Sequence, residues 1–379
     1  MVDFLIPFNH ASFGPQALEY VRQAVVMGKT AGDGPLAKKC EAQLSTIVGG
    51  GRVFLTPSCT AALEMAATLL GIGKDDEVIV PSFTFTSSAN AFVLFGAKPV
   101  FVDSRADTLN MDEAQVEQAI TSRTKAIVVM HYAGVACEMG AILAIAKKHG
   151  IPVIEDNAHG LFGSHQGRPL GSFGAIATQS FHETKNLGCG EGGAIVINDA
   201  SLIARAEMLR EKGTNRMQFH RGQVDKYSWV DTGSSWLVSE FQAAVLLDQL
   251  ERAKEIQASR FRVWDAYARE LAPWAQAQGV RLPSVPKDCG HPAHAFYLLL
   301  PTAQMADRFM AHMKERGILA VSHYVPLHAS PMGRKFGGQA GDCPVMEDFS
   351  TRLVRLPLFA TLDDLRLMCV VDAVKAWSK

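Results

Sequence analysis

A lysine in a glycine-rich loop is the residue of this chain best placed to do chemistry. Lys185 lies in residues 182–193, HETKNLGCGEGG, between two apolar runs that predict strands, ATQSF and AIVIN. The glycines leave room beside the lysine for a flat ligand, and a neutral lysine amine can form an imine with an aldehyde. A lysine chosen blindly is more often a solvated loop residue, so this interpretation needs support from other segments.

Two further strand ends supply groups that complement such a lysine. Asp156 ends the predicted strand PVIED, and its carboxylate could hold a heteroaromatic ring with His159 close by. Thr60 and Ala61 follow the predicted strand VFLT and open a predicted helix, whose first N–H groups suit an anion. The alternative for both segments is an ordinary helix N-cap. Phe85, after the predicted strand EVIVPSF, could stack on a ring or be a core aromatic.

Together these segments provide what pyridoxal 5'-phosphate requires: a phosphate site, an acid for the pyridine nitrogen and a lysine for the aldehyde. Residues 188–193 also match the glycine pattern of dinucleotide-binding proteins. That pattern must open a helix, whereas here a strand follows, so a dinucleotide site is rejected. The twelve histidines form no tight ligand cluster in the sequence, and we therefore expect no metal site.

The elements that must position these residues follow from the hydrophobic pattern. Between residues 50 and 200, short apolar runs alternate with helical patterns, which predicts an α/β fold with a mostly parallel sheet. We expect a large domain over residues 1–245 and a smaller C-terminal α+β domain over residues 246–379. A capping box at Ser239 and Gln242 predicts the start of a long helix that ends near Pro273. Residues 319–325, LAVSHYV, predict a strand of the smaller domain.

Composition and net charge restrict where the protein is expected to be located and what it is expected to bind. The net charge of −1 gives no basic field for nucleic acid or for acidic membranes. No C-x-x-C pair occurs among the seven cysteines, and the N-terminal MVDFLIPFNH has no basic region before its short apolar run. We expect a cytoplasmic protein that binds neither nucleic acid nor membrane.

Five segments resemble one known family, and they occur in its order and spacing. They are PSCTAALEMAA, PSFTFTSSANAFV, HYAGVACEM, EDNAHG and SFHETKNLGCGEGGAIVIND. The chain resembles the DegT-type sugar-nucleotide aminotransferases, which are fold-type I pyridoxal-phosphate enzymes, from Pro7 to its C-terminus. The resemblance implies a homodimer with active sites at the subunit interface.

The resemblance also implies a role for individual residues at the cofactor. Lys185 would form the imine, Asp156 would face the pyridine nitrogen, and His159 would lie near the 3-hydroxyl group. Phe85 would stack on the ring, and Thr60, Ala61 and Ser180 would bind the phosphate. Where many relatives have an asparagine that the partner subunit donates to the phosphate, this chain reads GSSWL, and Ser234 or Ser235 is the candidate to take its place.

Four stretches, GKTAGDGP, REKGTNR, FHRGQVDKYSW and RLPLF, are most similar to one branch of this family. That branch transfers the amino group of L-glutamate to C4 of a nucleotide-linked sugar, dTDP-4-keto-6-deoxy-D-glucose. Residues of these stretches that could meet the nucleotide are Lys29, Arg216, Arg221, Lys226 and Tyr227; the default interpretation is a set of surface side chains. Three residues of SHYVPLH that could close over the sugar, or belong to a packed strand end, are His323, Tyr324 and His328.

Three rival functions remain at this point. The first is a sugar aminotransferase that acts at C3 or gives the gluco epimer, and the cofactor motifs do not separate it. The second is a sugar dehydratase of the same fold, but those relatives characteristically lack the lysine. The third is a non-catalytic regulator, which the presence of both Lys185 and Asp156 disfavours.

Overall fold

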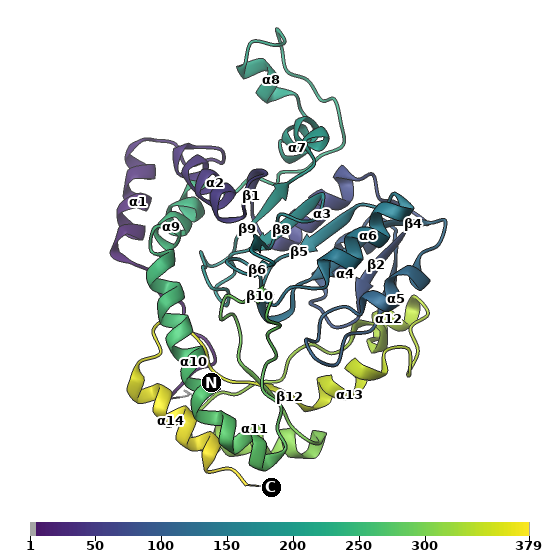
Figure 1. The fold of residues 1–379 in the computed structure, drawn as a ribbon. Helices are drawn as coiled ribbons and strands as arrows, with labels where there is room; N and C mark the ends of the chain where they lie inside the picture. Colours follow the sequence, from purple (N-terminus) through teal and green to yellow (C-terminus); the bar gives the residue numbers. More distant parts are fainter. Residues whose placement is uncertain (1–4, 379) are drawn as a thin grey trace.

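A seven-stranded sheet forms the centre of the computed structural model (Figure 1), which describes residues 5–378. Residues 1–4, the start of the predicted large domain, and residue 379 lie outside the described residues. In sheet order the strands are β1 (Arg52–Thr56), β9 (Gly193–Ile197), β8 (Ile176–Ser180), β5 (Val153–Asp156), β4 (Thr124–Met130), β2 (Glu77–Pro81) and β3 (Lys98–Val102). All neighbours from β8 to β3 are parallel, and only β9 runs antiparallel to its neighbours. The mostly parallel α/β sheet is therefore confirmed.

Helices bury both faces of this sheet, which explains why its strands are almost entirely apolar. One face packs against α3 (Cys59–Leu69), α4 (Ser87–Val93) and α7 (Ile203–Arg210). The other face packs against α2 (Pro35–Ile47), α5 (Glu113–Val116), α6 (Met139–His149) and α9 (Glu240–Glu251). Helix α1 (Pro15–Val26) lies on α9. The short α8 (Arg216–His220) lies on an arm, residues 211–235, that projects from the body (Figure 1).

The C-terminal part of the chain has a hydrophobic core of its own. The core joins α10 (Ala253–Gln278), α11 (Ala303–Glu315) and α14 (Asp364–Lys375) to the two-stranded sheet of β11 (Tyr297–Leu299) and β12 (Leu353–Arg355). The remaining elements are β6 (Ser164–His165), β7 (Arg168–Pro169), β10 (Cys289–Gly290), α12 (Pro331–Lys335) and α13 (Pro344–Arg352), with short 3₁₀ turns at 117–119, 132–134, 200–202 and 327–329. The predicted division at residue 245 falls inside α9, whose apolar residues belong to the core around α2; it stays a prediction.

Two predictions about the C-terminal part are wrong. The long helical pattern forms two helices, α9 and α10, which meet at Arg252, and Pro273 lies inside α10 rather than at its end. Proline cannot donate to the carbonyl of the fourth residue before it. The helix nevertheless continues to Gln278 and ends at Gly279, where φ is +63°, because Trp274 and Ala275 are buried in the core beyond the proline.

The predicted strand at residues 319–325 forms only a single bridge, between Val321 and Arg355. Hydrogen bonding to β12 stops there, and the side chains of His323 and Tyr324 line a cleft instead of extending a sheet. Within residues 5–378, no helix is both long and apolar enough to cross a membrane.

The capping box at the start of α9 is confirmed. Ser239 Oγ accepts from the N–H of Gln242, and the Gln242 side chain accepts from the N–H of Ser239. We expect Ser239→Ala to lower the free energy of unfolding by about 1 kcal/mol, because an N–H of the first turn loses its acceptor. Urea unfolding followed by circular dichroism measures this loss. Ser228→Ala, at an exposed serine that caps no helix, is the control; an equal loss in both variants would contradict the role of the cap.

Candidate functional site

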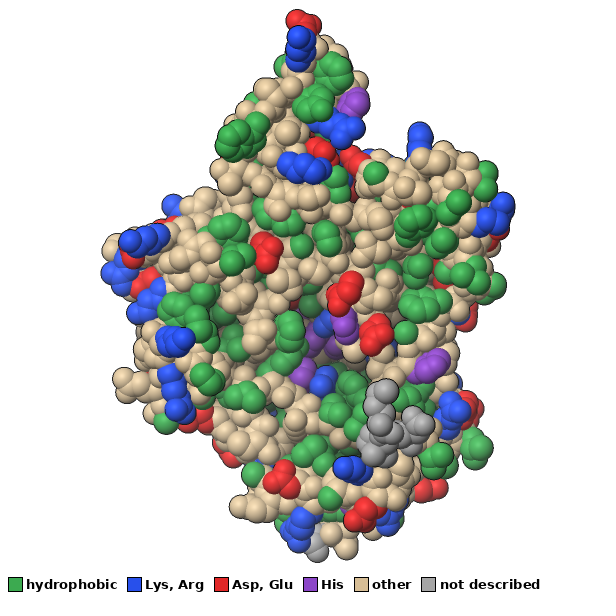
Figure 2. Space-filling model, turned by 180° about the vertical axis from the view of Figure 1, so that it is seen from behind, with side chains coloured by type: hydrophobic (Ala, Val, Ile, Leu, Met, Phe, Trp, Pro, Cys, Tyr) green, Lys and Arg blue, Asp and Glu red, His purple; other side chains and the backbone are tan. Residues whose placement is uncertain are grey.

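The carboxyl ends of the parallel strands open into a cleft of about 820 Å³. Its wall on the sheet side includes residues that follow β1, β2, β5 and β8, and its opposite wall comes from the C-terminal part of the chain. Figure 2 shows histidine and basic side chains gathered at a hollow near the centre of this face of the molecule. Of the predicted residues, the cleft is lined by Lys185, Asp156, His159, Thr60, Ser180, Phe85, His323 and Tyr324.

Lys185 lies in the loop between β8 and β9, as the sequence predicted. Its backbone N–H donates to the carbonyl of His182, which holds the loop in a tight turn. The ammonium group finds no hydrogen-bond partner among the described residues, and burial lowers the pKa of Lys185 below its ordinary value. A lowered pKa increases the fraction of neutral amine, the form that attacks an aldehyde.

Asp156 stands at the carboxyl end of β5 and is buried. Its Oδ2 accepts a hydrogen bond of 2.6 Å from Ser88 Oγ, and its Oδ1 accepts one of 3.2 Å from the N–H of Ala158. No described cation pairs with this carboxylate. Since a buried carboxylate without a cation is costly, the site favours a ligand that brings a positive charge or an acidic N–H. Ser88 belongs to the motif PSFTFTSSANAFV, but sequence reasoning assigned it no role.

The start of α3 forms an anion site beside these two residues. Ser58 caps the helix by accepting from the N–H of Ala61, and Thr60 Oγ1 lies 2.7 Å from Ser87 Oγ. Thr60 lines the cleft. Ala61, which was also predicted to bind the phosphate, does not line the cleft, and its N–H donates to the capping Ser58. The first turn of the helix still offers free N–H groups and the positive end of its dipole.

His159 and His294 stack at the floor of the cleft, with ring centroids 4.2 Å apart. His159 Nε2 lies 3.2 Å from the hydroxyl of Tyr324, and its buried Nδ1 has no partner. Burial lowers the pKa of both histidines well below the ordinary value, and the charge of Lys185 acts in the same direction, which favours the neutral form of each ring. The orphaned Nδ1 of His159 is a polar atom that a bound ligand would satisfy.

Sequence reasoning missed His294, although it opens the motif HAFYLLL. The amide nitrogen of Asn186 donates to the carbonyl of Pro292, so its Oδ1 is the acceptor facing His294 Nδ1 at 2.8 Å. This bond places the proton of the neutral imidazole on Nδ1. It also ties the residue next to Lys185 to the C-terminal part of the chain.

Arg355 is the second residue that the sequence missed, although it begins the motif RLPLF. It lines the cleft from β12, stacks over the ring of Phe8 at 4.6 Å and donates from Nε and Nη2 to the carbonyl of Ser322. Burial lowers its pKa, and no described carboxylate pairs with it. A half-buried guanidinium with no counter-ion favours an anionic ligand.

Of three further predicted residues, two line the cleft and one does not. Phe85, 55% exposed, lies 6.2 Å from the ring of Tyr324 at the mouth of the cleft, and Ser180 lies on its wall. His328 differs from the prediction, because it is fully buried outside the cleft. Its Nδ1 lies 2.6 Å from Ser82 Oγ and its Nε2 2.8 Å from Glu347 Oε1, so both ring nitrogens are engaged.

The remaining predicted residues lie outside the cleft of their own chain. Ser234 and Ser235 are exposed at the base of the projecting arm. The predicted nucleotide contacts are also exposed: Lys29 on the body, and Arg216, Arg221, Lys226 and Tyr227 on the arm. Arg221 pairs with Glu207 at 2.6 Å, and Arg216 lies 3.4 Å from Glu211. These pairs are typical of solvated surface side chains.

The residues of the cleft fit pyridoxal 5'-phosphate. A carboxylate without a cation, an amine without a partner, an orphaned ring nitrogen and a helix N-terminus converge at one set of strand ends. With the mostly parallel sheet and the smaller C-terminal unit, they define a fold-type I, pyridoxal-phosphate-dependent aminotransferase.

Comparison with known proteins gives the family. Residues 12–375 match the DegT/DnrJ/EryC1/StrS aminotransferase family, and the chain belongs to it. It is therefore an enzyme of the sugar aminotransferase type that uses pyridoxal phosphate.

Three relatives illustrate the likeness. The spore coat polysaccharide biosynthesis protein SpsC of Bacillus subtilis is 32% identical over 98% of this chain and 96% of its own. The putative sugar aminotransferase Spr1654 of Streptococcus pneumoniae, solved in PLP and PMP forms, superposes in its PMP form with a TM-score of 0.91 at 25% identity, covering 98% of each chain. DesV of S. venezuelae superposes with a TM-score of 0.87 at 32% identity, covering 95% of this chain and 94% of DesV.

Gly193 offers a test of the anion site. A Cβ at this position would lie 2.3 Å from the carbonyl carbon of Ser58 and 2.4 Å from the nitrogen of Cys59. Gly193→Ala should displace the start of α3, lower the free energy of unfolding by about 1–3 kcal/mol, and weaken cofactor binding by about 10-fold or more. Urea unfolding and titration of the apoenzyme with pyridoxal phosphate measure the two effects.

Gly140→Ala is the matched control, since no atom lies within 4 Å of a Cβ there and the residue is in helix α6. Its stability should stay the same or rise, because alanine favours a helix. Unchanged cofactor affinity in Gly193→Ala would show that the start of α3 does not hold the phosphate.

Proposed function

We propose that this enzyme transfers the amino group of L-glutamate to C4 of dTDP-4-keto-6-deoxy-D-glucose, giving dTDP-4-amino-4,6-dideoxy-D-galactose and 2-oxoglutarate. The observation that carries the transfer chemistry is the meeting of Lys185 and Asp156, each without a partner of opposite charge, in one cleft. The choice of sugar rests on GKTAGDGP, REKGTNR, FHRGQVDKYSW and RLPLF, which resemble the branch that serves enterobacterial common antigen synthesis. A role in surface polysaccharide synthesis also agrees with the name of the SpsC relative.

Bound pyridoxal phosphate supplies an aldehyde that carries the amino group and a ring that accepts electrons from the reacting carbon. Lys185 would hold that aldehyde, and its free amine would accept the proton of the donor α-carbon and later release it. The lowered pKa of Lys185 suits this exchange, because the amine must be neutral to accept the proton. Asp156, held by Ser88 and by the N–H of Ala158, keeps a proton on the pyridine nitrogen through a charge-assisted hydrogen bond.

His159 would lie near the 3-hydroxyl group of the cofactor, as the family resemblance implies. Its Nδ1 has no partner, its Nε2 faces the hydroxyl of Tyr324 and burial lowers its pKa, so it would orient the ring without adding a positive charge. His294 fixes His159 by stacking and is itself fixed by Asn186, the neighbour of Lys185. His294 is thus a positioning residue, and with its proton on Nδ1 its Nε2 is a hydrogen-bond acceptor.

Arg355 is proposed to bind the carboxylate of the donor amino acid. It is the one guanidinium on the cleft wall of the described residues, and it has no carboxylate partner within the chain. Arg355 and Lys185 line the same cleft, so one amino acid could present its carboxylate to Arg355 and its α-amino group on the side of Lys185. His323 and Tyr324, stacked at 3.7 Å, would then border the sugar.

A homodimer would bring the arm residues to a cleft. Trp229 and Tyr227 on the arm are 79% and 53% exposed, and Leu18 and Val26 on α1 are 77% and 73% exposed. Apolar side chains gathered on a surface favour burial against another protein. In such a dimer, Ser234, Ser235 and the basic residues of the arm would meet the phosphate and the nucleotide in the partner's cleft.

The cytoplasmic location of the enzyme stays a prediction.

Product analysis tests the substrate directly. The enzyme is incubated with L-glutamate and dTDP-4-keto-6-deoxy-D-glucose, and NMR of the product identifies the aminated carbon and its configuration. A 4-amino-galacto product supports the proposal. A 3-amino sugar or the gluco epimer would replace it with the related aminotransferase, and no amine formed from this keto sugar would refute the proposed substrate.

Lys185 is tested by borohydride. Reduction of the holoenzyme fixes the bond between the lysine nitrogen and the cofactor carbon, and peptide mass mapping should locate the pyridoxyl label at Lys185. Lys185→Ala should abolish turnover while the protein still binds the aminated form of the cofactor. Lys335→Ala, at an exposed lysine outside the cleft, should keep both label and activity. A label at another lysine, or turnover in Lys185→Ala, would refute the assignment.

Arg355 is tested by steady-state kinetics. Arg355→Gln should raise the KM for glutamate by about 10–100-fold, because a charged hydrogen-bonded contact is lost. The KM for the sugar should change little. Arg308→Gln, at an exposed arginine on α11, is the control. An unchanged KM for glutamate, or an equal rise for both substrates, would contradict a donor-carboxylate site.

A further inference from the structure

We propose that His165, Asp288 and Cys289 form a binding site for a zinc-type divalent metal ion, separate from the active-site cleft. None of the three residues lines the cleft, and among the described residues they are the one group of three histidine, cysteine or carboxylate side chains whose ligand atoms all lie within 4.8 Å of one another. Sequence spacing could not reveal the group, since His165 is separated from Asp288 by 123 residues.

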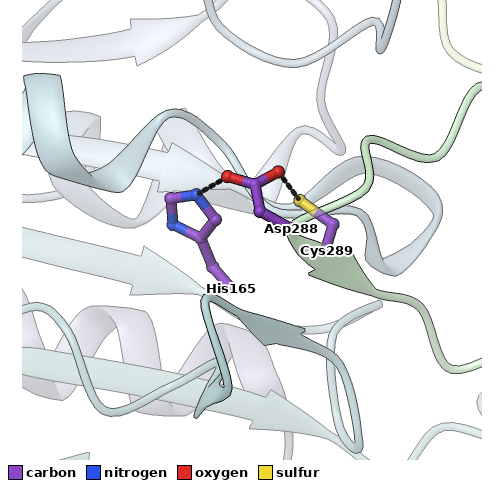
Figure 3. A group of neighbouring side chains, drawn as sticks. All are labelled: His165, Asp288 and Cys289. Atoms are coloured by element: carbon purple, nitrogen blue, oxygen red, sulfur yellow. Dashed lines mark hydrogen bonds and ion pairs between the residues drawn. The ribbon is translucent and has the colours of Figure 1, made fainter.

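Strand pairing brings the ligands together. His165 in β6 lies directly opposite Cys289 in β10, and the N–H of Gln166 donates to the carbonyl of Asp288 at 2.7 Å. Figure 3 shows the three side chains converging from these two segments, with Asp288 between the other two. Backbone pairing between the two segments therefore brings the three residues together.

The distances suit a tetrahedral ion. His165 Nε2 lies 3.1 Å from Asp288 Oδ2, and Cys289 Sγ lies 3.8 Å from Asp288 Oδ1. Zinc bonds of normal length at tetrahedral angles place such ligand atoms about 3.3–3.5 Å apart. All three ligand atoms lie within 4.8 Å of one another, so side-chain rotations that draw them closer would complete the coordination.

The mixture of donors selects the metal. One imidazole nitrogen, one sulfur and one carboxylate oxygen suit zinc, whereas magnesium and calcium prefer oxygen alone. The side chain of His165 is only 5% exposed and that of Asp288 is 47% exposed, so the site is anchored on one side and open on the other. A water molecule can enter from the open side as the fourth ligand.

A metal at this place would fix the connector between α10 and β11. That connector continues from Cys289 to Pro292, which accepts from Asn186 and Gln257, and to His294. Its other end is therefore already attached next to Lys185. The expected effect of the metal is to stabilise this edge of the molecule, with no part in amino transfer.

The test uses the holoenzyme after treatment with a chelator. One equivalent of zinc should bind in competition with a chromophoric chelator and raise Tm by about 2–4 °C. X-ray absorption at the zinc edge should show one sulfur at about 2.3 Å and nitrogen or oxygen ligands at about 2.0 Å. Cys289→Ser and His165→Asn should each weaken zinc binding by about 100-fold or more.

Cys369→Ser is the control, since Cys369 is an exposed thiol on α14. It should leave zinc affinity and the sulfur signal unchanged. The proposal is overturned if the wild-type enzyme binds no zinc at micromolar concentration, if bound zinc shows no sulfur ligand, or if Cys289→Ser binds as tightly as wild type. The absorption experiment on the wild-type enzyme decides the matter even where a variant fails to fold.

Discussion

Charges without counter-ions in one cleft are the constraint on which the rest of this structure depends. Asp156, Lys185 and Arg355 all face a space of about 820 Å³, and none of them pairs with an opposite charge within the described chain. Burial makes such groups costly, and here it lowers the pKa of Lys185 and of Arg355. Ligands that bring opposite charges to these side chains should bind well. Binding of the cofactor and of the donor should therefore raise the free energy of unfolding.

Neutral groups hold these charged side chains in place. Ser88 and the N–H of Ala158 donate hydrogen bonds to the carboxylate of Asp156. The carbonyl of Ser322 and the ring of Phe8 hold the guanidinium of Arg355. These neutral partners hold the charged side chains in position without cancelling their charge. The packed cores on both faces of the sheet offset the free energy lost by leaving the charges unpaired.

The sequence allowed prediction of whatever depends on local order along the chain. Apolar strands, the glycine-rich loop of Lys185 and the carboxylate at the end of β5 are local patterns, and parallel strands necessarily bring their carboxyl ends to one edge. His294 and Arg355 could not be found this way, because they reach the cleft only through the docking of the C-terminal unit. The predicted helix end at Pro273 was wrong for a related reason. Burial of Trp274 and Ala275 outweighs the hydrogen bond lost at the proline, and burial depends on tertiary structure.

The contact between Asn186 and the C-terminal connector joins the two units at the point of chemistry. Asn186 directly follows Lys185, and its side chain binds the carbonyl of Pro292, the side chain of Gln257 and the ring of His294. Any shift of the connector is therefore transmitted to the lysine loop through hydrogen bonds that are buried or half-buried. Since His294 also stacks on His159, the same shift would move the ring that faces the proposed 3-hydroxyl position. The lysine and the orienting histidine thus share one support, and the geometry of the cleft depends on how the C-terminal unit is docked.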